Sequence, residues 1–288
     1  MLRLTKLIHC NSIIYFMCVL MGGCDSKTDD IFSDARNKLN EDKVMEAFEV
    51  YSKGIKKYPN APEGFNGLGK VYLRMGEPDK AFNAFEQAIR IAPNKADAFL
   101  GRGKILFSKK QYPEAFKDAN RAIELENTNF EGFALRSKTL KELGNDKEAL
   151  DDISHAISLS PDVMNLYLDR AYLYFYTFKM EGNAKDDLTR ALKCHRVGDG
   201  AFGGAATTKA LVHMLMASVY ENSNEPLSAL RSYTDAIESD PKFNLPYLFR
   251  GWLYEKFQKQ KEADDDFAQA KKLEEDEAKT NPYMRKAK

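Results

Sequence analysis

A glycine-rich run in the first third of the chain has the spacing of a phosphate-binding loop. Gly64 is followed by four residues and then by Gly69 and Lys70. Such a loop also needs a Ser or Thr directly after the lysine to bind Mg²⁺, and it connects a strand to the start of a helix. Val71 occupies the hydroxyl position, and the neighbouring residues have the periodicity of a helix. The run is therefore not expected to bind a nucleotide.

The other side chains that could carry out chemistry are scattered along the chain. His155, His195 and His213 lack the spacing of zinc ligands, and no Gly-x-Ser-x-Gly nucleophile motif is present. His213 falls at an aromatic core position, so a packed ring is expected there. The acidic runs at 151–152 and 264–266 are typical of a solvated helix face. We therefore expect no enzyme activity, no metal, no cofactor and no small-molecule substrate.

The composition excludes several further classes of protein. Lys and Arg number 43 against 43 Asp and Glu, so the formal net charge is zero and a dedicated nucleic-acid binder is not expected. The 18 Phe and 14 Tyr exclude intrinsic disorder, and four Cys in 288 residues are too few for a disulfide-stabilised scaffold.

The first residues have the pattern of an export signal. Arg3 and Lys6 precede a mostly apolar run at 7–21, and two glycines stand directly before Cys24. The run is too short and too polar for a spanning helix. The segment resembles the signal peptide of bacterial lipoproteins, in which the cysteine becomes the lipidated first residue. The alternative is an ordinary signal peptide or a short membrane anchor.

The lipoprotein resemblance implies a signal peptide at 1–23, a lipidated (palmitate-bearing) linker at 24–27 and a chain held at a bacterial envelope membrane, facing the periplasm. Asp25 resembles the residue type that retains some lipoproteins at the inner membrane, and the choice between inner and outer membrane stays open. Removal of the signal would take Cys10 and Cys18, so that Cys194 would be the one unmodified cysteine.

The rest of the chain is built on a 34-residue period. Pro59 and Pro93 are 34 residues apart, and Pro161 follows after twice that distance. The unit at 62–95 shows the pattern most clearly, with these residues: Phe65, Leu68, Gly69, Tyr72, Ala81, Phe85, Ala88 and Pro93. They match positions 4, 7, 8, 11, 20, 24, 27 and 32 of the tetratricopeptide repeat, and the chain resembles that family.

Seven units follow from this alignment: 28–61, 62–95, 96–129, 130–163, 164–198, 210–243 and 244–277. The fifth unit has one extra residue, 199–209 is a glycine-rich insertion and 278–288 is a polar tail. The resemblance implies an all-α solenoid, a right-handed superhelix of two-helix units whose first helices line the concave face. The insertion is interpreted either as a hinge or docking loop, or as a tolerated surface insertion whose last residues lengthen the next helix.

Two positions of the repeat vary together. Position 7 is Arg in the same four units in which position 23 is Asp. The paired residues are Arg102 and Asp118, Arg136 and Asp152, Arg170 and Asp187, and Arg250 and Asp266. A half-buried guanidinium needs a partner of opposite charge. We therefore predict partly buried structural ion pairs, either within a repeat or between neighbours.

Position 9 is expected to face the concave groove. There the chain has four successive cations, Arg36, Lys70, Lys104 and Lys138, and then aromatic residues: Tyr172, with Phe175 and Tyr176 on the same helix, and later Trp252. A line of cations that meets an aromatic patch suits an acidic or extended peptide with apolar anchors. The alternative is that the lysines are ordinary solvated residues.

The function implied by these patterns is a non-enzymatic scaffold or adaptor that is anchored to the membrane and binds protein or peptide partners in its groove. The resemblance to lipoproteins with such repeats implies a role in pilus assembly, in secretion-channel assembly or in cell-wall machinery, and the sequence does not choose among these. The alternative is a structural protein whose solenoid associates with copies of itself.

Overall fold

The computed structural model describes residues 26–198 and 204–280, and these residues are almost entirely helical. The chain divides into two compact units, Met1–Glu126 and Asn127–Lys288. The first contains α2 (Ser26–Asn40), α3 (Val44–Lys57), α4 (Pro62–Arg74), α5 (Pro78–Ile91), α6 (Ala96–Ser108) and α7 (Tyr112–Leu125). None of the described helices is long and apolar enough to cross a membrane.

The second unit continues the same alternation of helices and short turns. It contains α8 (Phe130–Glu142), α9 (Asp146–Leu159), α10 (Met164–Tyr172), the π-helix η1 (Leu173–Thr177), α11 (Glu181–Ala191), α12 (Gly204–Asn222), α13 (Pro226–Ser239), α14 (Leu245–Lys256) and α15 (Gln260–Thr280). The predicted all-α fold is thus confirmed, and among the described residues β-pairing is limited to one isolated bridge between Val163 and Arg196.

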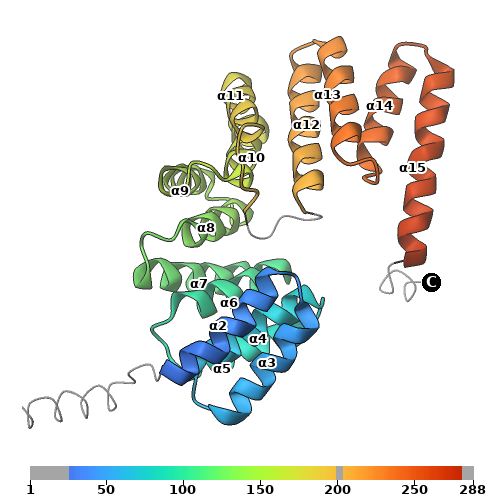
Figure 1. The fold of residues 1–288 in the computed structure, drawn as a ribbon. Coiled ribbons are helices and arrows are strands. Elements are labelled where there is room, and N and C mark those ends of the chain that lie inside the picture. Colours follow the sequence, from blue (N-terminus) through green and yellow to red (C-terminus); the bar gives the residue numbers. More distant parts are fainter. Residues whose placement is uncertain (1–25, 199–203, 281–288) are drawn as a thin grey trace, which may run out of the picture. The chain divides into compact units, whose positions relative to one another are not determined.

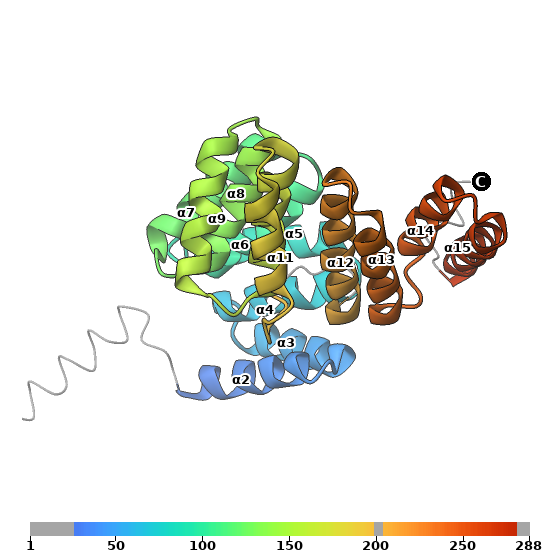
Figure 2. The ribbon, with the colours of Figure 1, turned by 90° about the horizontal axis from the view of Figure 1, so that it is seen from above.

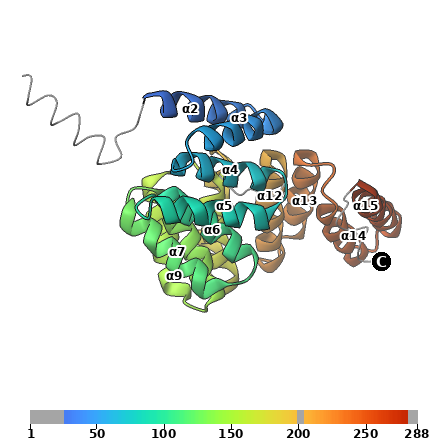
Figure 3. The ribbon, with the colours of Figure 1, turned by 90° about the horizontal axis from the view of Figure 1, so that it is seen from below.

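The helices pack as consecutive hairpins. In the first unit α2 pairs with α3, α4 with α5 and α6 with α7, and the hairpins stack in chain order (Figure 3). In the second unit α12 and α13 lie side by side in two perpendicular views, and α14 pairs with α15 (Figures 1 and 2). Each hairpin supplies the first and second helix of one repeat, and within each unit neighbouring hairpins pack against each other.

Aromatic rings at position 24 fill the space left by small residues. Phe85 is fully buried. A Cβ added at Gly69, in the same repeat, would lie 2.7 Å from the Phe85 ring, and one added at Gly101, in the next repeat, would lie closer still. The glycines around Lys70 therefore belong to the interior of α4, where they allow close packing of helices instead of cradling a phosphate.

The turn between the two helices of every hairpin needs a left-handed residue. Position 15 has φ between 57° and 81° in all seven repeats, at Asp42, Gly76, Lys110, Gly144, Lys179, Asn224 and Gln258. A left-handed backbone disfavours residues with a Cβ. The turns therefore accept five non-glycine residues at a small cost in stability.

This cost predicts opposite effects at two turns. Gly144 has φ of 81° and nothing within 4 Å of an added Cβ, so Gly144→Ala tests the backbone alone. We expect Gly144→Ala to lower the free energy of unfolding by about 1 kcal/mol. Lys110→Gly should raise it by about 0.5 kcal/mol, because strain relief exceeds the added entropy of the unfolded chain. Urea unfolding checks both, and the same sign for both changes would contradict the explanation.

The extra residue of the fifth repeat is absorbed by the π-helix. Lys179 takes the left-handed turn position one residue later than its counterparts, so the insertion precedes it. Residues Leu173–Thr177 form the π-helix in this interval, and the Phe178 amide donates to the Leu173 carbonyl, five residues back. A single inserted residue widens an α-helix locally in this way.

The structure also adjusts the predicted boundaries. The last residues of the 199–209 insertion are helical, because α12 begins at Gly204. The polar tail begins inside α15, which continues to Thr280, and α2 begins within the 24–27 linker. The signal at 1–23 and Cys24 lie outside the described residues.

Candidate partner-binding surface

All four predicted Arg–Asp pairs are present, each within a single repeat. In every pair Nε and Nη2 of the arginine donate to the two carboxylate oxygens, at distances between 2.7 and 2.8 Å. The aspartates are buried, with Asp187 only 3% exposed. The Arg170–Asp187 pair spans 17 residues where the others span 16, because η1 adds one residue between the partners.

Three of the arginines also reach the preceding repeat. Nη1 of Arg170 donates to the Ser154 hydroxyl at 3.2 Å, and Nη1 of Arg250 donates to the Thr234 hydroxyl at 3.1 Å. Nη1 of Arg102 lies 3.7 Å from a carboxylate oxygen of Glu86. The hydrogen bonds that these guanidinium groups donate to the aspartates raise the pKa of the guanidinium groups. The arginines therefore join two helices of one repeat to the second helix of the previous one.

Aromatic side chains cover these guanidinium groups. Arg170 lies 5.9 Å from the ring centre of Tyr167 and 5.7 Å from that of Tyr174. Arg250 has the same neighbours at the same spacing, Tyr247 and Tyr254. Since their donors are engaged and their faces covered, these arginines stabilise the solenoid and are not available to a partner.

Two cations of the predicted line, Lys70 and Lys138, form ion pairs with acids of the next repeat. Lys70 lies 3.1 Å from Asp97 on the first helix of the next repeat. Burial would raise the pKa of Asp97, but Lys70 and a hydrogen bond from Asn66 outweigh it and lower that pKa. Asp97 also interacts with the charge of Lys104.

The second unit repeats this arrangement, since Lys138 lies 3.0 Å from Asp169. Arg36, in the first repeat, interacts with the phenol of Tyr51. At two of the four predicted cations, Lys70 and Lys138, position 9 of one repeat is therefore ion-paired with an acid of the next repeat.

The aromatic residues of the fifth repeat form a cluster on the first-helix face. The rings of Tyr172 and Tyr176 lie 4.4 Å apart, and Phe175 packs edge-on against Tyr176 at 4.8 Å. Tyr172 and Tyr176 are 43% and 45% exposed, while Phe175 is partly buried. Trp252, on α14, is 49% exposed and packs edge-on against Phe249.

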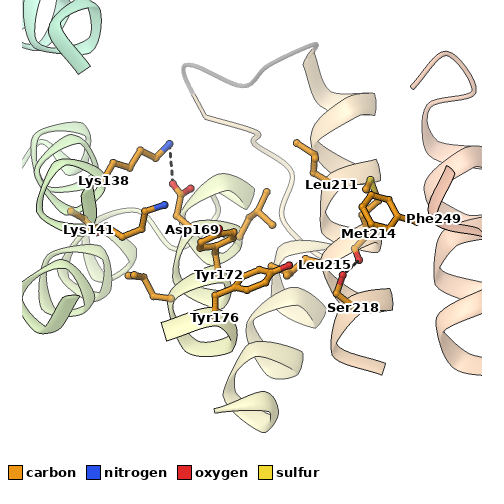
Figure 4. Close-up of a pocket in the computed structure, with 13 residues that line it drawn as sticks. Lys138, Lys141, Asp169, Tyr172, Tyr176, Leu211, Met214, Leu215, Ser218 and Phe249 are labelled. Carbon is orange, nitrogen blue, oxygen red and sulfur yellow. Dashed lines mark hydrogen bonds and ion pairs between the residues drawn. The ribbon is translucent and has the colours of Figure 1, made fainter. Parts of the chain in front are cut away.

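A pocket of about 380 Å³ opens beside the two tyrosines (Figure 4). It is lined by first helices of four successive repeats of the second unit, from α8 to α14. Tyr172 and Tyr176 form one wall, with the Lys138–Asp169 pair and Lys141 beyond them; the opposite wall comes from Leu211, Met214, Leu215, Ser218 and Phe249. The surface can hold an apolar side chain between aromatic and aliphatic walls.

The sequence pattern anticipated only one wall of this pocket. The resemblance to the repeat family implies that positions 2, 5 and 12 of the first helix face the groove together with position 9. Leu211 and Met214 occupy positions 2 and 5 of the sixth repeat. Lys141 occupies position 12 of the fourth repeat. The position in the repeat could therefore have identified these residues as pocket residues. However, apolar residues at such positions look like core residues in the sequence, and only the packing distinguishes the two.

Among the described residues, the three histidines and Cys194 are not gathered into one site. His213 is largely buried, and its pKa is lowered by this burial, as expected for a packed ring. His155 packs against Phe133, and exposed His195 contacts Asp162. Burial raises the pKa of Cys194. Within residues 26–198 and 204–280 no group of three or more His, Cys, Asp or Glu could hold a metal ion.

Comparison with known proteins agrees with this geometry. Residues 66–130 match the family model of the tetratricopeptide repeat. The structure of PilF from Pseudomonas aeruginosa is similar with a TM-score of 0.63 at 16% identity, covering 81% of this chain and 97% of PilF. The chain folds as a tetratricopeptide-repeat protein.

Other solved structures with this repeat fold extend the comparison. A tetratricopeptide-repeat protein from Parabacteroides merdae has a TM-score of 0.55 at 17% identity, covering 82% of this chain and 88% of its own. A chain of the Cut9–Hcn1 complex of the APC/C has a TM-score of 0.72 at 12% identity, covering 88% of this chain and 48% of its own. No curated protein matches the sequence. At these identities the similarity concerns the fold alone.

Proposed function

We propose that this tetratricopeptide-repeat protein is a non-enzymatic scaffold that binds protein or peptide partners on its first helices. Repeats of this kind mediate protein–protein interactions. The Arg–Asp pairs and the tight packing around Phe85 fix neighbouring helices within each unit, and such fixed helices lower the entropic cost of binding.

The main support for this proposal is the placement of the exposed aromatic side chains. In the described part of the chain the three most exposed large aromatics are Trp252, Tyr176 and Tyr172, and all three lie on first helices. The most exposed large apolar side chains on second helices are not aromatic; they are Met45 and Leu227. Tyrosine and tryptophan dominate binding hot spots, so the first-helix face is the better candidate for recognition.

Capture of partners from cell-envelope extracts tests this assignment. The triple variant replaces Tyr172, Tyr176 and Trp252 with Ser. We expect it to capture at least tenfold less of each partner protein than wild type does, since each removed hot spot weakens binding strongly. The matched control Met45→Ser, Leu227→Ser removes exposed apolar side chains from second helices and should capture as wild type does. Equal capture by the triple variant would contradict the assignment.

We further propose that the scaffold is held at a bacterial envelope membrane by a lipid on Cys24. The support is the sequence of the first residues, with basic Arg3 and Lys6, a short apolar run and two glycines before the cysteine. Two or more acyl chains give stable anchoring, while one chain alone binds reversibly. Assembly of envelope machinery such as a pilus, a secretion channel or the cell wall is the role in which such an anchored scaffold would serve.

Metabolic labelling tests the anchor. Cells given a palmitate analogue should label the wild-type chain, and Cys24→Ala should abolish the label and release the protein from the membrane fraction. Cys194→Ala is the matched control, because Cys194 is partly buried and would stay unmodified. Unchanged labelling of Cys24→Ala would exclude this anchor.

A further inference from the structure

The pocket on the second unit has two chemically different sides. One side is apolar and includes Met214 and Phe249, which also pack against the buried cluster around Tyr233. The other side contains Tyr172 and Tyr176, whose rings lie 4.4 Å apart and are less than half exposed. A planar or branched apolar side chain would contact both sides at once and would displace water from the rings.

Charged groups lie at the tyrosine side of the pocket. Lys138 is paired with Asp169, and Lys141 lies 4.5 Å from the centre of the Tyr172 ring (Figure 4). The lining thus carries two ammonium groups and one carboxylate, a balance of one positive charge. Lys141 forms an ion pair with Glu142 at 3.1 Å, and because Glu142 does not line the pocket, the ammonium group of Lys141 is the charge that the pocket presents at this point. A carboxylate placed beside the bound apolar group would therefore meet a complementary charge.

The fifth repeat differs from the others at this wall. The π-helix runs from Leu173 to Thr177, and two of its residues, Leu173 and Tyr176, line the pocket. An inserted residue that widens a helix is often found at functional sites. The departure from the regular repeat thus coincides with the pocket, as would be expected if the pocket serves recognition.

We infer that the pocket binds an extended segment of a partner protein that presents an aromatic or large aliphatic side chain next to an acidic residue. This inference rests on the proposed function and names the chemistry of the partner. The volume of about 380 Å³ is at the low end for ligand pockets, which suits one or two side chains of a peptide. The apolar side chain lies between Tyr176 and Met214, and the acidic group lies toward Lys141.

Selection from a phage-displayed library of random dodecapeptides tests the inference on the full-length chain. Peptides enriched on wild type should share an aromatic or large aliphatic residue next to Asp or Glu. Their affinity, measured by fluorescence anisotropy, should fall at least tenfold for the double variant Tyr172→Ala with Tyr176→Ala. It should fall at least tenfold for the single variant Lys141→Glu as well. Lys141→Arg should retain binding. Lys147→Glu is the matched charge control, because Lys147 is exposed on α9 and does not line the pocket.

The outcomes separate this inference from the proposed function. Three outcomes would overturn the pocket assignment. The enriched peptides bind the double tyrosine variant as tightly as wild type, the enriched peptides lack the acidic residue, or the library yields no peptide. Dimerisation that the tyrosine variant abolishes would identify a second copy as the occupant and would also overturn it. In each case the scaffold function is tested separately, by the capture of partner proteins from cell-envelope extracts. Both tyrosines are exposed, so unchanged circular dichroism is expected for the variants.

Discussion

Replacing Asp152 with Ala is expected to lower the free energy of unfolding by about 3 kcal/mol, because it leaves the Arg136 guanidinium half-buried without its carboxylate. Nε and Nη2 of this arginine donate to the two carboxylate oxygens of Asp152 at 2.7 Å, and Asp152 is 8% exposed. Asp151 is the matched control, since it is the preceding residue on the same helix and is exposed. Asp151→Ala should change stability by less than about 0.5 kcal/mol.

Urea unfolding followed by circular dichroism gives both values under the same conditions. Equal losses for the two variants would mean that the pair adds nothing beyond an ordinary surface charge. A double change of Arg136→Met and Asp152→Leu should recover much of the loss, since an apolar pair of similar size avoids the desolvation cost. Failure of the double variant to recover would indicate that the charges themselves are needed for packing.

Replacing Phe85 with Ala is expected to cost about 4 kcal/mol, the effect of a large cavity in a closely packed core. The ring is fully buried and lies against Gly69 of its own repeat and Gly101 of the next. Its loss therefore weakens a repeat and the interface to its neighbour together. In a solenoid such a loss is transmitted along the stack, so the urea transition should also broaden.

Gly101→Ala provides the reciprocal test. Its added Cβ would overlap the Phe85 ring, so the single change should destabilise by about 2 kcal/mol. Phe85→Leu in the same chain makes room for the Cβ and should make the double variant more stable than the sum of the two single losses. Additive losses would show that the glycine does not serve to accommodate the ring.

The frame of the molecule was predictable because it is encoded in residues that recur at a fixed period. The Arg and Asp of positions 7 and 23 occur in the same four repeats, which predicted that they interact. The extra residue of the fifth repeat was visible in the sequence, but its form was not. An inserted residue can lengthen a turn or widen a helix into a π-helix, and the packing of Leu173 and its neighbours decides between the two. The 34-residue period gives no information about this packing.

The candidate partner-binding surface was less predictable for a related reason. The period placed Lys70 and Lys138 on the groove face, but their charges are balanced by Asp97 and Asp169. Asp97 follows Lys70 by 27 residues, whereas Asp169 follows Lys138 by 31 residues. Because the two separations differ, a repeated spacing in the sequence could not predict both ion pairs. The pocket combines side chains from four repeats, and only the packing of the second unit brings them together.

The most direct test of recognition by first helices is photocrosslinking in living cells. A benzophenone amino acid replaces Tyr176 or Trp252 on first helices, or Met45 or Leu227 on second helices; all four side chains are exposed. Crosslinked partners are expected from positions 176 and 252 and not from positions 45 and 227. Crosslinks that form only from 45 and 227 would place recognition on the second helices and contradict the proposed function.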